Sequence, residues 1–277
     1  MEALDDASFR ARVKDELAAL RGRQVMMFYS GGRDSSVVLH FLEGAAREFG
    51  FAFETHAALF PLHVYPPEER ARLDRYWRER GVFIRWHEIP AAEDALEQAR
   101  REGTSPCRVC NATKKSALMR YIRERKVDLD RLTIVMSYSL WDLVSACLEH
   151  LLSAKFAAPG NDRAVRYKPV EERFRETFQR FYPLLRLPGG LSVFKPLIFW
   201  NDPQIEEVLA REAIAVLQTS CRFKPFRPKR SLSALYERLG LAFDFERVRA
   251  FAAEALGLPP AEVFSAMPRE DYLRNLL

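Results

Sequence analysis

Residues 24–42 read QVMMFYSGGRDSSVVLHFL, and this stretch decides the fold. The apolar run up to Tyr29 predicts a buried strand, and the run from Val37 onward has the spacing of a helix. Gly31 and Gly32 lie between them and let backbone N–H groups turn toward an anion with no Cβ in the way. The following helix directs the positive end of its dipole at the same point. The stretch therefore predicts a strand, a phosphate-binding loop and a helix in direct succession.

The polar residues of this loop indicate its ligand. Ser30, Ser35 and Ser36 add hydroxyl donors. Asp34 does not suit a site for an anion alone, and it indicates a divalent cation that bridges the carboxylate and the phosphates, for which hard oxygen ligands favour Mg²⁺. The Gly-Lys-Ser/Thr ending of the Walker loop is absent. A glycine turn that only joins strand to helix is the structural alternative.

Short β-rich runs and helical patterns alternate through the chain. We expect strands near 24–29, 51–60, 82–87 and 132–136, and helices near 35–49, 67–80, 91–101, 111–125 and 142–154. After a less regular stretch, 191–199 predicts a strand pair or bent strand, 203–212 a helix and 214–217 a last strand. The alternation predicts an α/β fold with a doubly wound, mostly parallel sheet.

The same patterns divide the chain into segments. Residues 1–23 have the spacing of an N-terminal helix, and 24–228 are expected to form the nucleotide-binding domain, with a basic insertion at about 155–190. From 229 to 277 every periodic segment is helical, including one predicted helix at 259–277. This predicts a small helical C-terminal appendage.

The bulk composition excludes some classes of protein. The chain has 277 residues, of which 48% are hydrophobic and 29% charged, as in a folded globular protein rather than a disordered one. No secretion signal or membrane-length apolar run is visible, so we expect a cytoplasmic protein with no membrane contact. Basic residues interleaved with aromatics gather at 163–186 and 222–230, which suits RNA or a plain solvated surface.

The phosphate loop resembles that of a known superfamily. Ser-Gly-Gly-x-Asp-Ser after a first strand is similar to the signature of the PP-loop ATP pyrophosphatases, whose fold is called adenine nucleotide alpha-hydrolase-like. The resemblance implies an enzyme that cleaves ATP between the α and β phosphates and adenylates a substrate oxygen. It implies that Ser30, Gly31, Gly32, Asp34, Ser35 and Ser36 bind ATP and Mg²⁺.

A second loop of that superfamily, Gly-His-x-x-Asp-Asp, is matched only in part. The stretch after the predicted strand at 132–136 reads SYSLWD, and only its last residue, Asp142, agrees. Asp142 is the candidate carboxylate for the metal or the acceptor, and its position also suits a helix cap. Tyr138 and Trp141 depart from the pattern, which leaves the acceptor open.

Three of the four cysteines form a second candidate site. Cys107 and Cys110 form a CxxC motif in the loop before the predicted helix at 111–125, and Cys221 lies in a late loop. Cys147 falls on an apolar helix face and is expected in the core. Because loops at the carboxyl ends of parallel strands meet at one crevice, Cys221 is expected to approach the pair. Three thiolates without a fourth suit a [4Fe-4S] cluster with one open iron; a zinc site completed by His, a redox dithiol and chance spacing are the alternatives.

The cysteine pattern is similar to that of the iron–sulfur tRNA thiolases of the PP-loop class, the 2-thiocytidine and 2-thiouridine synthetases. Lys114 follows the CxxC as the basic residue does there, and the run VFKPLI at 193–198 is similar as well. The resemblance implies that Lys114 either neutralises charge on the phosphates or tunes the cluster. No cysteine precedes Cys107, which favours the 2-thiocytidine-like branch or a side branch.

The resemblance thus implies an ATP-dependent sulfurtransferase that adenylates a carbonyl oxygen, replaces it with sulfur and acts on a tRNA base. The catalytic residues would be Asp142, Lys114, Cys107, Cys110 and Cys221. A sulfur donor is required, and a homodimer is one option for the assembly. Two alternatives stay open: a PP-loop sulfurtransferase or amidating synthetase acting on a small molecule or cofactor precursor, and a non-catalytic nucleotide- or RNA-binding module.

Overall fold

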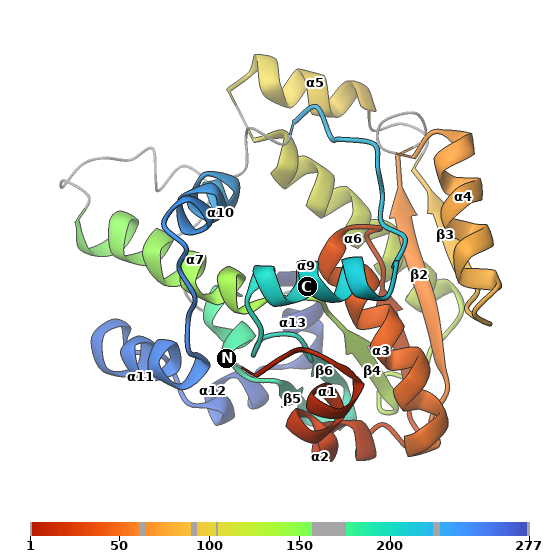
Figure 1. Cartoon of the computed structure of the whole chain (residues 1–277), viewed down its shortest axis with the longest axis horizontal. Helices are drawn as coiled ribbons and strands as arrows, with labels where there is room; N and C mark the ends of the chain where they lie inside the picture. The colour runs from red at the N-terminus through yellow and green to blue at the C-terminus, as the bar shows by residue number, and fades with distance from the viewer. Residues whose placement is uncertain are drawn as a thin grey trace.

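A computed structural model of the chain describes residues 2–60, 65–89, 93–103, 105–156, 176–223 and 228–275. Its centre is a six-stranded sheet in the order β3-β2-β1-β4-β6-β5 (Figure 1). The strands are β1 Gln24–Phe28, β2 Phe53–Leu59, β3 Ile84–Glu88, β4 Leu132–Val135, β5 Leu184–Arg186 and β6 Ser192–Phe194. Neighbours pair in parallel except β5 with β6. The predicted mostly parallel α/β sheet is confirmed.

Helices bury both faces of this sheet in two separate cores. In β1, Val25 and Met27 point into one core and Met26 into the other, as side chains alternate along a strand. The first core is covered by α1 Asp6–Arg12, α2 Lys14–Ala18, α3 Arg33–Phe49, α4 Pro67–Arg78 and α9 Asp202–Arg211. The second is covered by α6 Pro106–Glu124, α7 Leu140–His150, α11 Phe245–Leu256, α12 Ala261–Ser265 and α13 Arg269–Asn275. Helix α5, Glu93–Arg101, lies next to α6, and α10, Pro228–Arg238, next to α7.

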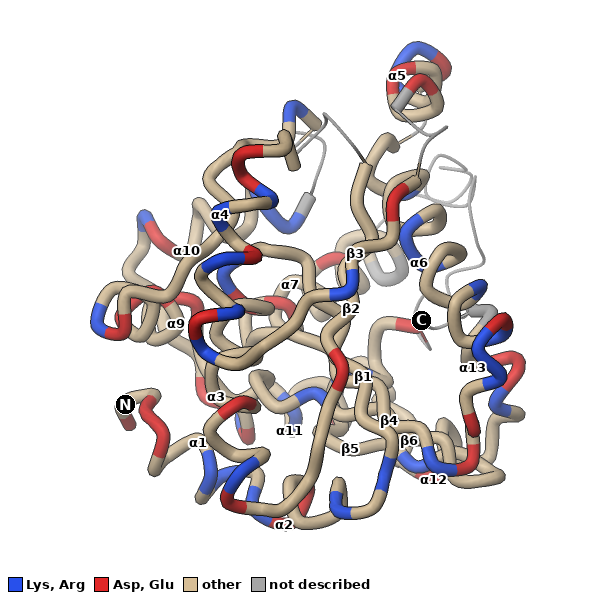
Figure 2. Tube along the Cα trace, turned by 90° about the vertical axis from the view of Figure 1, so that its right-hand side faces the viewer, with Lys and Arg blue, Asp and Glu red and all other residues tan. Residues whose placement is uncertain are grey.

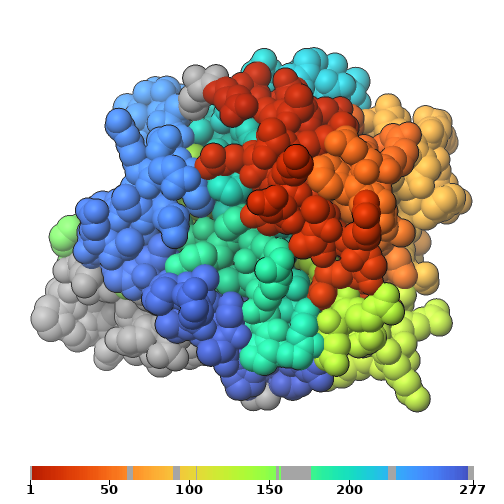
Figure 3. All heavy atoms as spheres, turned by 90° about the horizontal axis from the view of Figure 1, so that it is seen from below, coloured from red at the N-terminus to blue at the C-terminus, as the bar shows by residue number. Residues whose placement is uncertain are grey.

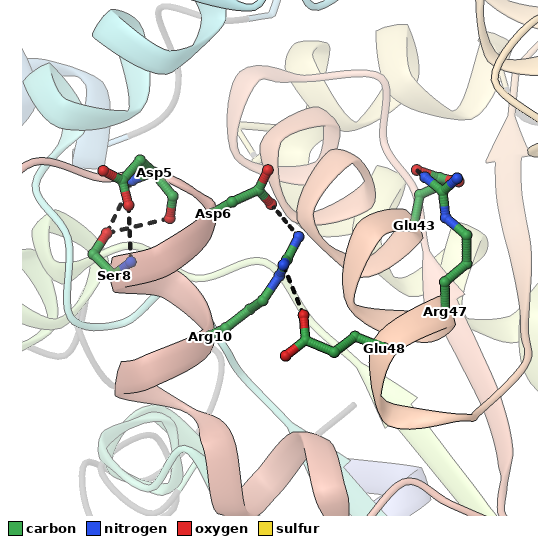
Figure 4. A network of polar contacts seen from close by, with 7 residues as sticks. All are labelled: Asp5, Asp6, Ser8, Arg10, Glu43, Arg47 and Glu48. Atoms are coloured by element: carbon green, nitrogen blue, oxygen red, sulfur yellow. Dashed lines mark hydrogen bonds and ion pairs between the residues drawn. The ribbon is translucent and has the colours of Figure 1, made fainter.

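The N-terminal segment forms two short helices, α1 and α2, where one was predicted. They break at Val13, whose φ of −123° and ψ of 29° are not helical. Phe9 of α1 stacks on Phe41 of α3 with ring centroids 4.6 Å apart, and the segment lies across α3 and beside α9 (Figure 3). Arg10 also pairs with Glu48 of α3 at 2.7 Å (Figure 4). The segment is thus part of the first core.

The C-terminal region is helical over its described residues, as predicted, but its last part differs. The predicted helix at 259–277 is wrong, because two short helices, α12 and α13, are separated by a turn that ends at Pro268. The domain boundaries at 23 and 228 stay predictions. The basic insertion falls largely on residues 157–175, outside the described residues.

Two more predictions need correction in the sheet. The predicted strand at 214–217 is wrong: this segment leaves the sheet and runs to the loop after β1, where the Leu217 N–H donates to the Gly31 carbonyl at 2.7 Å. Strand β5 was not predicted, since its three residues are too few to show a period. The bent strand predicted at 191–199 is only β6, followed by turns.

The strand order places a topological switch point between β1 and β4. The chain builds β2 and β3 on one side of β1 and then returns to add β4, β6 and β5 on the other. Loops that leave neighbouring strands in opposite directions open a crevice, and ligands of such sheets bind there. None of the described helices has the length and apolar character that a membrane span requires.

Candidate nucleotide and thiol site

The loop after β1 has a backbone that only glycine permits at one position. Gly31 has φ of +71°, and a Cβ there would lie 2.7 Å from the hydroxyl oxygen of Tyr65 and 3.3 Å from Cβ of Leu217. Gly32 is the N-cap of α3, with extended backbone and φ of −77°. The first N–H groups of α3 have no acceptor inside the helix and point at the mouth of the loop. This geometry suits an anion.

The serines of the loop divide into two roles. The hydroxyls of Ser30 and Ser35 lie 3.0 Å apart, and that of Ser35 also donates to the Gly32 carbonyl at 3.0 Å. Ser36 is fully buried, and its hydroxyl lies 3.3 Å from that of Tyr29, which accepts from Trp77 Nε1 at 3.0 Å. Ser36 therefore braces the loop from the core, while the exposed Ser30 remains at the mouth.

The loop after β4 closes on itself. The Ser139 N–H donates to Oδ2 of Asp142 at 3.0 Å. This bond belongs to a capping box in which Ser139, and not Asp142 as the capping alternative expected, is the N-cap of α7. The Ser139 hydroxyl donates to Oδ1 of Asp202, at the start of α9, at 2.7 Å. The other oxygen of Asp202 pairs with Nη2 of Arg33 at 3.1 Å. Asp202 thus links the two loops.

Three carboxylates influence one another in this crevice. Burial raises the pKa of Asp34 to about 7, with Lys229 opposing and Asp142 and Asp202 adding to the rise. Burial also acts to raise the pKa of Asp142, but the ion pair with Lys229 outweighs it and the pKa lies below its usual value. Burial acts to lower the pKa of Lys229, yet the three carboxylates raise it. The crevice therefore holds a resident positive charge among acidic groups.

The thiols gather around the end of β2. The CxxC lies in the first turns of α6, so its predicted loop position is wrong; Ser105 and Pro106 start the helix before it. The Cys107 thiol lies 3.7 Å from the Phe223 carbonyl oxygen. Cys110 packs against Ala58 and Phe60.

Cys221 packs against Leu59 and Tyr65. Cys110 and Cys221 thus belong to two neighbouring apolar clusters that both include residues from the end of β2. Tyr65 is in the same cluster as Cys221. Burial raises the pKa of its hydroxyl, and Tyr29 and Cys110 add to the rise. In the part of the chain that the structure describes, no three His, Cys, Asp or Glu side chains are arranged to hold a metal ion.

Known proteins with a related sequence or a related fold include two that modify tRNA with sulfur. No family model matches the chain. The chain is 26% identical over 201 residues to the tRNA-cytidine(32) 2-sulfurtransferase of Geobacter sulfurreducens, which covers 72% of this chain and 68% of that protein. The U34-tRNA thiolase NcsA of Methanococcus maripaludis, solved with its [4Fe-4S] cluster, superposes with a TM-score of 0.56 at 14% identity, covering 98% of this chain and 79% of that one, and so shares the fold.

The 26% identity to a tRNA sulfurtransferase and the fold shared with NcsA agree with the predicted PP-loop superfamily. The turn at Ser30–Asp34 has the sequence of the PP-loop signature, and beside it the ammonium of Lys229 forms an ion pair with Asp142. Asp34, on the PP-loop, is electrostatically coupled to the same group. Asp34 and Asp142 are carboxylates, the kind of ligand that Mg²⁺ prefers, and both interact with Lys229.

The three cysteines match the ligands of a [4Fe-4S] cluster in kind but not fully in arrangement. Three half-buried thiols share one neighbourhood of the PP-loop protein, and cysteine is the ligand that such a cluster requires. Among the described residues, however, no three His, Cys, Asp or Glu side chains share a centre that could hold a metal. Lys114 lies one turn beyond Cys110, with its ammonium 5.8 Å from the centroid of the Phe60 ring. Cys147 is buried in the second core, which confirms its predicted role.

Two residues of the PP-loop crevice, Asp202 and Lys229, were not predicted from the sequence. Asp202 follows Asn201 at a helix start, where it resembles an ordinary capping residue. Lys229 lies in the basic stretch 222–230, whose charge suggested RNA contact, but its ammonium faces Asp142. That RNA role for Lys229 is not supported by its position. Of its neighbours, Arg230 is exposed, and Arg227 lies outside the described residues.

Proposed function

We propose that this PP-loop protein is an ATP-dependent sulfurtransferase that thiolates a tRNA base. The observation that carries the proposal is the left-handed turn at Gly31 beside the coupled carboxylates Asp34 and Asp142, with Cys110 and Cys221 packed near the end of β2. The sequence relative that is named a tRNA-cytidine(32) 2-sulfurtransferase supports the acceptor. The shared fold with a tRNA thiolase supports the architecture.

In the proposed reaction the PP-loop binds the phosphates of ATP through the first N–H groups of α3 and the Ser30 hydroxyl. Asp34 and Asp142 would hold Mg²⁺, which would offset the phosphate charge. A carbonyl oxygen of the base attacks the α-phosphate, the bond to the β-phosphate breaks, and pyrophosphate leaves. Sulfide then attacks the adenylated carbon, the carbon–oxygen bond breaks, and AMP leaves. Lys114 adds positive charge near the thiols.

A [4Fe-4S] cluster, when bound, would supply an open iron where sulfide is held, with Cys107, Cys110 and Cys221 as its protein ligands. The tRNA surface is expected to rely on particular exposed cations such as Arg230. Lys and Arg are interspersed with Asp and Glu along the outer helices (Figure 2). Because both signs are mixed there, a uniformly basic face does not direct RNA binding over these helices.

The first test is iron and sulfide content after purification without oxygen, for the wild-type protein, Cys221→Ala and Cys147→Ala. We expect about four irons per chain in wild type and Cys147→Ala, and a loss of most of them in Cys221→Ala, because, of the two substituted cysteines, Cys221 is an assigned ligand and Cys147 is not. Equal iron in all three proteins contradicts the three-cysteine assignment.

The second part of the test supplies ATP, Mg²⁺, sulfide and an unmodified tRNA transcript. Pyrophosphate and a thiolated nucleoside, detected by mass spectrometry, are expected in equal amounts. Pyrophosphate release that does not depend on tRNA contradicts tRNA as the acceptor and favours a small molecule. No pyrophosphate release contradicts an ATP-cleaving enzyme and favours a binding module.

A further inference from the structure

Lys229 reaches the PP-loop crevice from a segment far along the chain. It lies in the first turn of α10, and its ammonium forms an ion pair with Oδ1 of Asp142. The side chain of Asp142 is only 13% exposed and that of Lys229 33% exposed. Helix α10 is held against α7 by Tyr236, which packs edge-on to Trp141 at 5.2 Å. The ion pair is thus positioned by packing and is not a chance surface contact.

The charges around this ammonium come from every element that lines the crevice. Asp34 comes from α3, Asp142 from α7 and Asp202 from α9, and all three act on Lys229. Two arginines compensate part of this charge, Arg33 beside Asp202 and Arg180 toward Asp142. Asp202 is engaged by Arg33 and Ser139, so Lys229 is the cation assigned directly to Asp142.

A divalent cation bound at Asp142 would compete with Lys229 for the same carboxylate. It requires the carboxylate oxygens of Asp142 that Lys229 contacts, and two positive groups at one carboxylate repel each other. We propose that Lys229 is an internal counter-ion that occupies the cation position of the nucleotide-free protein, and that Mg²⁺ bound with ATP displaces it from Asp142. The inference rests on the proposed function, which assigns Asp34 and Asp142 to the cation. It makes Lys229 a positioning residue that keeps the acidic crevice folded and closed to free divalent cations.

The proposal is tested by titrating Mn²⁺ without nucleotide and measuring free Mn²⁺ by electron paramagnetic resonance. Lys229→Met should bind Mn²⁺ about tenfold more tightly than wild type, because a neighbouring positive charge is removed from a partly buried site. Lys229→Arg should retain the weak binding, and Arg230→Met, an exposed neighbour on the same helix, should leave it unchanged. A lysine with a merely structural role predicts weaker or unchanged Mn²⁺ binding in Lys229→Met, and that result overturns the proposal.

A second measurement uses the wild-type protein and does not depend on a variant that folds. Acylation of the Lys229 amine, followed by mass spectrometry, should increase several-fold when Mg²⁺ and α,β-methylene-ATP are added together, because displacement frees the ammonium. Unchanged or lower labelling overturns the proposal. If no variant and no nucleotide complex binds Mn²⁺, the assignment of Asp34 and Asp142 fails as well; if wild type binds Mn²⁺ and Lys229→Met binds it no better, only the counter-ion role fails.

Discussion

The loops after β1 and β4 leave neighbouring parallel strands, yet they use their polar groups in opposite ways. The PP-loop after β1 keeps the side chain of Ser30 exposed beside Gly31, which has the left-handed conformation. The loop after β4 satisfies its own groups, with Asp142 accepting from Ser139 and pairing with Lys229. The first loop thus presents an exposed hydroxyl, whereas the carboxylate of the second is already paired with an ammonium.

The difference shows how a binding loop is specified. The PP-loop depends on residues that are adjacent in sequence, since a glycine turn and the start of a helix form its anion site. The loop after β4 depends on Asp202 and Lys229, which lie 60 and 87 positions beyond Asp142 (202 − 142 and 229 − 142). A local motif can reveal the first arrangement but not the second.

The largest expected effect comes from breaking the open loop. In Gly31→Ala the new Cβ meets the Tyr65 hydroxyl at 2.7 Å in a conformation with φ of +71°. We expect ATP binding, measured by calorimetry, to weaken at least about a hundredfold, because the turn must shift away from the geometry that aims its N–H groups. The melting temperature should fall as well.

Gly32→Ala is the matched control for that change. Its Cβ would meet only the Ser30 hydroxyl oxygen, at 3.4 Å, and its φ of −77° suits any residue. ATP binding should weaken less than about threefold, within the range of an ordinary surface substitution. Equal losses in both variants would show that the loop requires flexibility or space in general rather than the left-handed turn at Gly31.

The pH dependence of stability tests whether a second buried lysine, Lys195 on the β4 side of the sheet, keeps its charge as Lys229 does. Lys195 follows β6, is fully buried and donates to the amide oxygen of Gln179 at 3.3 Å. Burial, with Arg180 adding, lowers the pKa of Lys195 to about 7, whereas carboxylates raise that of Lys229. Above pH 7 the unfolded chain binds more protons at this lysine than the folded one, so stability rises with pH up to the unfolded pKa near 10.5.

Lys195→Met should remove this slope. Between pH 7.5 and 9 the unfolding free energy of the wild type should rise by about 1–2 kcal/mol more than that of the variant. This is the change expected when unfolding takes up one proton per molecule. Urea unfolding at several pH values measures it, provided that the slope with urea is the same for both proteins. Parallel pH profiles would mean that Lys195 keeps its proton in the folded protein, as Lys229 does.

The sequence allowed most of the sheet to be predicted, because the central strands are buried on both faces and bounded by clear turn signals. Prediction from the sequence failed where contacts with distant parts of the chain determine the conformation. Residues 214–217 have an apolar run typical of a strand, but Leu217 bonds to the PP-loop backbone at Gly31 instead of joining the sheet. The start of α6 was available from Ser105 and Pro106, yet the CxxC suggested a loop. Likewise, the basic stretch around Lys229 does not reveal in sequence that one of its cations turns inward.

The smallest expected effect concerns the residue that joins the two loops. Asp202 is buried, accepts the Ser139 hydroxyl at 2.7 Å and pairs with Arg33 at 3.1 Å, so Asp202→Asn keeps the shape but weakens both contacts. Unfolding free energy should fall by about 1–2 kcal/mol, as for a hydrogen bond to a charged group. Glu206→Gln is the control, because Glu206 pairs with the same Arg33 from an exposed position and should cost less than about 0.5 kcal/mol. If the two variants lose equal stability, the Arg33 ion pair and not the bond to Ser139 carries the contribution of Asp202, and the loops after β1 and β4 are then held independently.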